Sequence, residues 1–113
     1  MRMLDFNAIQ QPTWQLKLKD DAQTVVNLSV PSVDLMDRLE ASVSEFQEIT
    51  KTKDGRAIRK LYDLVAEVFN CNDDGLTFTG DELRTKYRMS LLDLAKFELG
   101  YLDFIGEIKE AKN

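Results

Sequence analysis

The segment from Met89 to Lys112 restricts the fold more than any other part of the chain, because it is apolar around most of a helix. At about 100° per residue, its apolar side chains cover an arc of roughly 240°, whereas an ordinary surface helix needs a stripe about 100° wide. The residues on this arc are Leu91, Leu92, Leu94, Ala95, Phe97, Leu99, Tyr101, Leu102, Phe104, Ile105 and Ile108. Such a helix has to be buried on more than one side, so we expect part of it to contact another chain.

The apolar arc of this helix divides into two rows of residues. The aromatic row is Phe97, Tyr101, Phe104 and Ile108, and the aliphatic row is Leu91, Ala95, Leu99 and Leu102. The aliphatic row is complete enough to face the core, which leaves the aromatic row free to bind a partner or another copy of the chain. We therefore predict the four residues of the aromatic row as the partner-binding or oligomer-binding site. The plain alternative is that the aromatic row is itself part of the core.

Two short segments before the helices have the alternating pattern of half-buried strands. Apolar residues occupy every second position from Trp14 to Leu18 and from Val26 to Val30. The polar stretch Asp20 to Gln23 between them is typical of a turn, so residues 13–30 are predicted to form an antiparallel β-hairpin. A lone hairpin is only marginally stable, and we expect helices to cover its apolar face.

Helical periodicity and capping signals follow the hairpin. Helices are expected at about residues 33–50, 56–70, 80–88 and 91–111. Ser32 fits an N-cap, and Thr79 with Glu82 and Ser90 with Asp93 have the spacing of capping boxes. The sequence therefore predicts an α+β fold, mostly α, with an N-terminal antiparallel β-hairpin followed by about four helices, the last one long. Residues 13–113 would form a single domain, preceded by an N-terminal arm over residues 1–12. The predicted core contains Leu39, Phe46, Leu61, Val65, Leu99 and Leu102.

Length and charge exclude several classes of protein. A domain of 113 residues buries roughly 65% of its unfolded surface and can fold without disulfides, and a single cysteine, Cys71, fits a reducing compartment. The net charge of −5 repels phosphate, so we expect no nucleic-acid partner. No apolar run reaches the roughly 20 residues of a membrane span, so we expect neither export nor membrane insertion.

The residues that carry catalytic or metal chemistry form no convincing constellation. The chain has no histidine, the commonest general base near neutral pH. The segment from Asn70 to Asp81 resembles a calcium loop, but Thr77 stands where an apolar residue is expected and Asp81 where a bidentate Glu is expected. Carboxylate pairs such as Asp34 and Asp37 have no third potential metal ligand at a suitable spacing in the sequence. We therefore predict no catalytic residue, no metal site and no cofactor, and we expect that the protein is not an enzyme.

The order of these elements resembles one known family. Two strands and a turn precede Pro31, two amphipathic helices, the segment from Asp74 to Leu83, and a closing helix with Phe97, Tyr101 and Phe104. Over most of residues 13–112 this order is similar to the tail assembly chaperones of long, non-contractile-tailed bacteriophages, although the turn from Asp20 to Gln23 lacks the glycine expected there. The resemblance implies a homo-oligomeric viral protein that binds the apolar helices of the tape measure protein in the cytoplasm of the bacterial host. It further implies that the protein is absent from the mature virion.

A second class of function also fits the sequence. The outer side of the first helix carries acidic residues such as Asp37, Glu45 and Glu48. A small acidic regulatory or inhibitory protein could use such a face to neutralise a basic protein partner. The two classes differ in the partner they require, which is an apolar helix for the chaperone and a basic surface for the inhibitor.

Overall fold

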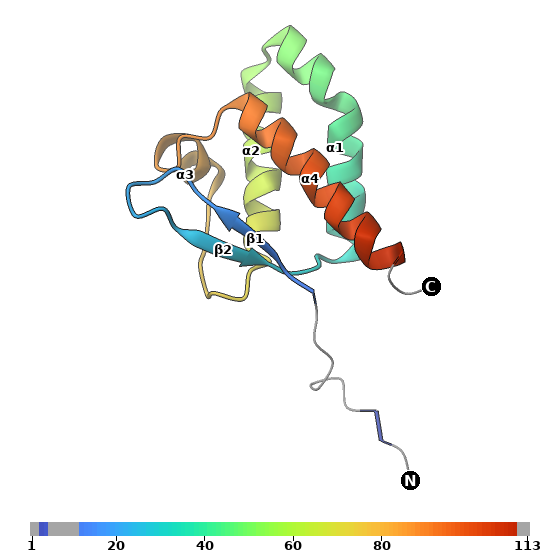
Figure 1. The fold of residues 1–113 in the computed structure, drawn as a ribbon. Coiled ribbons are helices and arrows are strands. Elements are labelled where there is room, and N and C mark those ends of the chain that lie inside the picture. The colour runs from blue at the N-terminus through green and yellow to red at the C-terminus, as the bar shows by residue number, and fades with distance from the viewer. Residues whose placement is uncertain (1–2, 5–11, 111–113) are drawn as a thin grey trace.

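The hairpin and the helices occur in the predicted order. The computed structural model describes residues 3–4 and 12–110, with side chains described up to residue 107. Its elements are β1 Trp14–Lys17, β2 Val25–Leu28, α1 Val33–Thr52, α2 Gly55–Phe69, α3 Gly80–Thr85 and α4 Leu91–Glu110 (Figure 1). The predicted α+β class is therefore confirmed, and α3 is the element that ends earlier than expected. Most of the predicted arm over residues 1–12 and the predicted end of the last helix at residue 111 lie outside the described residues.

The hairpin pairs β1 with β2 in antiparallel register, with Trp14 opposite Leu28 and Leu16 opposite Val26. Its turn is closed by Asp20, whose carboxylate accepts hydrogen bonds from the amide and the hydroxyl of Thr24. These bonds lower the pKa of Asp20. Gln23 adopts a positive φ of 50° in place of the expected glycine. The side chain of Asp20 thus fixes a turn that the sequence of its tip would not strongly favour.

The segment from Asn70 to Gly75 lies along the free edge of β2. The amide of Ser29 donates to the carbonyl of Cys71 over 2.8 Å, and the amide of Asp73 donates to the carbonyl of Asn27 over 3.1 Å. The Asp74 carboxylate also accepts from the backbone amide of Asn27 over 2.7 Å. These bonds satisfy backbone groups at an edge that would otherwise be open.

Polar residues at the helix starts satisfy free amides as their spacing predicts. Ser32 accepts from the amide of Leu35 over 3.2 Å, and Thr79 accepts from the amide of Glu82 over 3.1 Å. At the start of α4 the bonds are reciprocal, since Asp93 donates its amide to Ser90 Oγ and accepts from the Ser90 amide. This complete capping box fixes where α4 begins.

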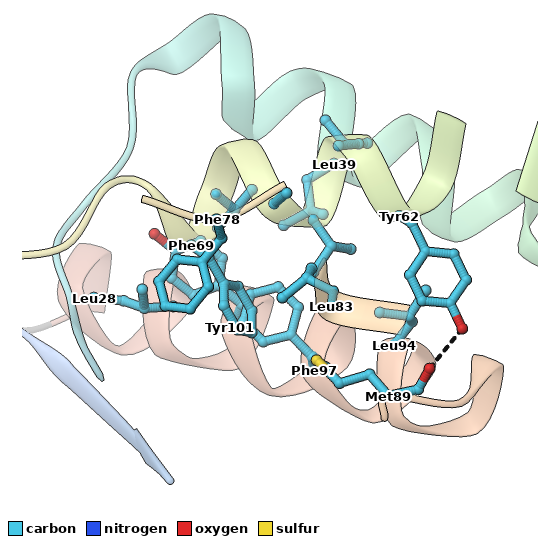
Figure 2. Close-up of a cluster of buried hydrophobic side chains, with 14 of the residues drawn as sticks. Leu28, Leu39, Tyr62, Phe69, Phe78, Leu83, Met89, Leu94, Phe97 and Tyr101 are labelled. Carbon is cyan, nitrogen blue, oxygen red and sulfur yellow. Dashed lines mark hydrogen bonds between the residues drawn. The ribbon is translucent and has the colours of Figure 1, made fainter. Parts of the chain in front are cut away.

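The core lies where α4 crosses α2 and the hairpin (Figure 2). Trp14 of β1 stacks on three rings of α4, with centroid distances of 5.8 Å to Phe97, 5.8 Å to Tyr101 and 6.2 Å to Phe104. The stack requires Gly100, because a Cβ there would lie 2.8 Å from Trp14 Cη2. Across the core, the Tyr62 hydroxyl donates to the Met89 carbonyl over 2.6 Å, which joins α2 to the segment before α4.

The predicted core is correct for the middle helices and partly wrong for the last one. Leu39, Leu61 and Val65 are buried as expected, while Phe46 and Leu102 are half-buried against the core cluster. Leu99, however, is 57% exposed, so its assignment to the core is wrong. The physical reason is the Trp14 stack, which turns the aromatic side of α4 inward and its aliphatic side toward solvent.

Two neighbouring leucines of α4 provide a matched test of this orientation. Leu94 is fully buried, whereas Leu92 is 64% exposed. We expect Leu94→Ala to lower the free energy of unfolding by about 2 to 5 kcal/mol, since it leaves a cavity in the core. Leu92→Ala should change it by no more than about 0.5 kcal/mol. Urea denaturation of both variants measures the difference, and equal losses would show that α4 is oriented differently.

Candidate protein interface

The structure buries two of the four residues in the aromatic row that the sequence predicted as a binding site. Phe97 and Tyr101 are buried, and the Tyr101 hydroxyl donates to the Ser29 carbonyl over 2.6 Å. Phe104 is half-buried, and the side chain of Ile108 lies outside the described residues. The expectation that this row lies free on the surface is therefore wrong for Phe97 and Tyr101. Partner binding through Phe104 and Ile108 stays a prediction.

The opposite side of α4 carries an apolar stripe that reaches solvent. We call it the outer stripe, and it consists of Leu92, Ala95, Leu99, Leu102 and Gly106. Leu92 and Leu99 are exposed, and the other three residues are half-buried. Their alternating spacing of three and four residues is the a and d pattern of a helix that packs along another helix. The same spacing can be read in the sequence. No exposed stripe is predicted from it there, because the sequence analysis places Leu99 and Leu102 in the core.

Helix α1 packs beside α4 (Figure 1). A shallow groove lies between α1 and the outer stripe. This α1–α4 groove has a volume of about 210 Å³. It is lined by Val43, Phe46 and Gln47 of α1 and by Ala95, Glu98 and Leu99 of α4. Most of its lining is apolar, and Glu98 is the single ionisable residue among the lining residues. The groove and the outer stripe together form one continuous apolar surface with one carboxyl group in it.

Glu98 is the most unusual residue of this surface, because its side chain is only 1% exposed. Its Oε2 accepts a hydrogen bond of 3.1 Å from Ser42 Oγ of α1. Its Oε1 is buried and has no hydrogen-bond partner among the residues that the structure describes. Ser42 Oγ also lies 2.8 Å from the carbonyl of Leu39, and a hydroxyl has one proton for these two acceptors. Burial therefore raises the pKa of Glu98 to about 7, and the bond from Ser42 limits the rise.

A second cleft, between α1 and α2, is larger but has a different character. It encloses about 670 Å³ and is lined by residues of both charges, including Arg38, Glu45, Lys60 and Glu67. Arg38 and Glu67 form an ion pair of 2.6 Å across it, with both side chains about half exposed. Mixed, solvated charges of this kind bind weakly and discriminate little between ligands.

The described residues offer no constellation for catalysis or metal binding. No three Cys, Asp or Glu side chains converge on one point within the described part of the chain. The asparagines of the calcium-like loop serve the loop itself, because Asn70 bonds the backbone of Phe78 and Asn72 bonds that of Leu76. Burial raises the pKa of Cys71, which disfavours its reactive thiolate form. Over the described ranges, no helix combines the length and the hydropathy needed to cross a membrane.

The buried carboxyl gives the fold a specific dependence on pH. The pKa of Glu98 rises from an ordinary 4.5 to about 7, so between these values the folded state holds a proton that the unfolded state has released. Stability therefore falls as pH rises through this range. From pH 5 to pH 8, wild type should lose about 2 kcal/mol more unfolding free energy than Glu98→Gln. Urea denaturation at both pH values measures this, and parallel losses in the two proteins would contradict the burial of an ionisable Glu98.

Comparison with known proteins finds no relative of this chain. No family model, no curated protein and no solved structure matches the chain.

Proposed function

We propose that this protein is a bacteriophage tail assembly chaperone that binds apolar helical segments of the tape measure protein and keeps them soluble during tail assembly. It would act in the cytoplasm of the host and without catalysis. The observation that carries the proposal is the outer stripe, which exposes Leu92 and Leu99 on a helix whose other side already fills the core. The order of the elements along the sequence supports the same family.

The shape of the surface favours a helical ligand. Residues of the outer stripe recur at the a and d positions of a heptad, and such a stripe packs best along a second helix. Ala95 and Gly106 within the stripe carry little or no side chain, so the axis of a second helix can approach closely there. Val43 and Phe46 of α1 would contact the second helix from the side of the groove. This is the helix-in-groove mode of recognition, in which apolar anchors supply most of the binding energy.

The outer stripe would also serve self-association. Exposed leucines at a and d positions are favourable contacts for another copy of α4 when no partner helix is present. We therefore expect a concentration-dependent homo-oligomer that the tape measure protein displaces. The acidic side of α1, with Glu45 and Glu48, would steer association at low salt more than it contributes affinity.

Replacement of the exposed leucines tests the proposal. Leu92→Asp with Leu99→Asp places two charges in the outer stripe while leaving the buried side of α4 intact. The double variant should lose co-purification with a co-expressed tape measure protein, because desolvation of the new carboxylates opposes helix packing. Light scattering over a wide dilution range should show that it also remains a monomer of about the mass of one chain, 13.0 kDa.

Leu76→Asp is the matched control, because Leu76 is an exposed leucine in the loop before α3. It should bind and assemble as wild type does, and circular dichroism should show both variants folded. Unchanged assembly and co-purification of the Leu92 and Leu99 variant would refute the proposed surface. Loss of binding on replacing Glu45 and Glu48 by Gln, with the leucine variant still active, would favour the acidic inhibitor instead.

A further inference from the structure

The side chain of Glu98 lines the α1–α4 groove, and one of its two carboxyl oxygens, Oε1, is buried without a hydrogen-bond donor among the described residues. Oε1 has no partner within the described residues, although the side chain is 1% exposed. A buried acceptor without a donor destabilises the fold, and an apolar residue of similar size would avoid that cost. The remaining lining of the groove is uncharged, so nothing in the groove itself neutralises a carboxylate.

We propose that the groove receives a partner helix whose apolar stripe contains one lysine, and that the ammonium of this lysine donates to Oε1 of Glu98. This inference rests on the proposed function, since it assumes that an apolar helix packs on the outer stripe. It adds the chemical feature that would distinguish the cognate segment from other apolar helices.

The protein's own cations are poorly placed to meet this need. Lys96 is two residues from Glu98 on α4 and is exposed, and positions two apart point to nearly opposite sides of a helix. Arg38 of α1 is paired with Glu67 of α2. Lys60 and Arg56 of α2 line the other cleft, on the far side of Ser42 from the groove. Lys19 is paired with Asp93 of α4. None of these described cations forms a bond with Oε1, so we place the donor on a partner molecule.

Lysine fits the groove better than other donors do. Its four-carbon stem can lie along Leu99 and Phe46 while its ammonium reaches the carboxyl, and this stem covers apolar surface as a leucine would. The planar guanidinium of arginine needs two aligned acceptors, but Oε2 already accepts from Ser42. A lysine also neutralises the carboxylate, which a neutral donor cannot do.

The contact couples binding to the release of a proton. An ammonium stabilises the ionised form of Glu98, whose pKa in the free protein is about 7. Binding of the lysine helix should therefore tighten about tenfold from pH 6 to pH 8, because the ionised fraction of free Glu98 rises by that factor. An otherwise identical helix with an uncharged apolar residue should bind less tightly at pH 8 than at pH 6. At pH 8 it would cover the ionised carboxylate of Glu98 without supplying a hydrogen-bond donor.

Two synthetic helices test the inference. Each has about 21 residues with leucine at the a and d positions of three heptads, and they differ at one central a position, which is lysine in one and norleucine in the other. Titration calorimetry with the full chain, at pH 6 and pH 8 and at fixed salt, gives both affinities. We expect the lysine helix to bind about tenfold more tightly at pH 8 than at pH 6, and to bind more tightly than the norleucine helix at pH 8. At pH 6 its binding should release nearly one proton, seen as a heat that depends on the buffer.

The variant Glu98→Gln should abolish both the preference for lysine and the pH dependence. Glu107→Gln, which alters an exposed carboxylate on the same helix, should leave both unchanged. Equal or tighter binding of the norleucine helix at pH 8 would overturn the lysine contact while leaving the apolar groove supported. Failure of both helices to bind would refute the groove itself, and the proposed function with it. A lysine preference that persists in Glu98→Gln would place the contact elsewhere and also overturn the inference.

Discussion

The stacking of Trp14 on the inner side of α4 is the interaction on which the rest of the arrangement depends. One indole contacts Phe97, Tyr101 and Phe104 across the space left by Gly100, and it thereby fixes the rotation of α4 about its axis. The Tyr101 hydroxyl strengthens this choice by donating to Ser29 at the end of the hairpin. Once these rings face inward, the outer stripe lies about 170° away around the helix and must face solvent or another chain.

Glu98 lies on α4 between the buried rings and the outer stripe, and this position explains its properties. It is close enough to the core to lose its water, yet it lines the groove that remains open to a partner. A carboxyl in such a place weakens the isolated protein at high pH and favours a complex that supplies a cation. In the proposed complex, stability of the free chain and recognition of the lysine are therefore opposed at this residue, a trade-off of the kind found at functional sites.

The sequence was sufficient for the order, type and approximate bounds of the elements, because alternation, helical periodicity and capping residues such as Ser90 and Asp93 are local signals. It was insufficient for the rotation of α4. A helix with apolar residues over most of its circumference has two possible inner faces, and the choice depends on a long-range contact with Trp14, 83 positions before Phe97. The burial of Glu98 was missed for the same reason, since helical spacing alone gave no ground to separate it from the solvated carboxylates.

The central claim is that a partner helix packs on the outer side of α4 beside α1. Methyl NMR of leucine- and valine-labelled protein, titrated with the lysine-bearing helix, tests it most directly. The account predicts that the methyl signals of Leu92, Leu99 and Val43 shift on binding, while those of buried Leu83 and of Leu76 in the distant loop stay in place. Shifts confined to Leu76 and Val33, with Leu92 and Leu99 unchanged, would contradict it.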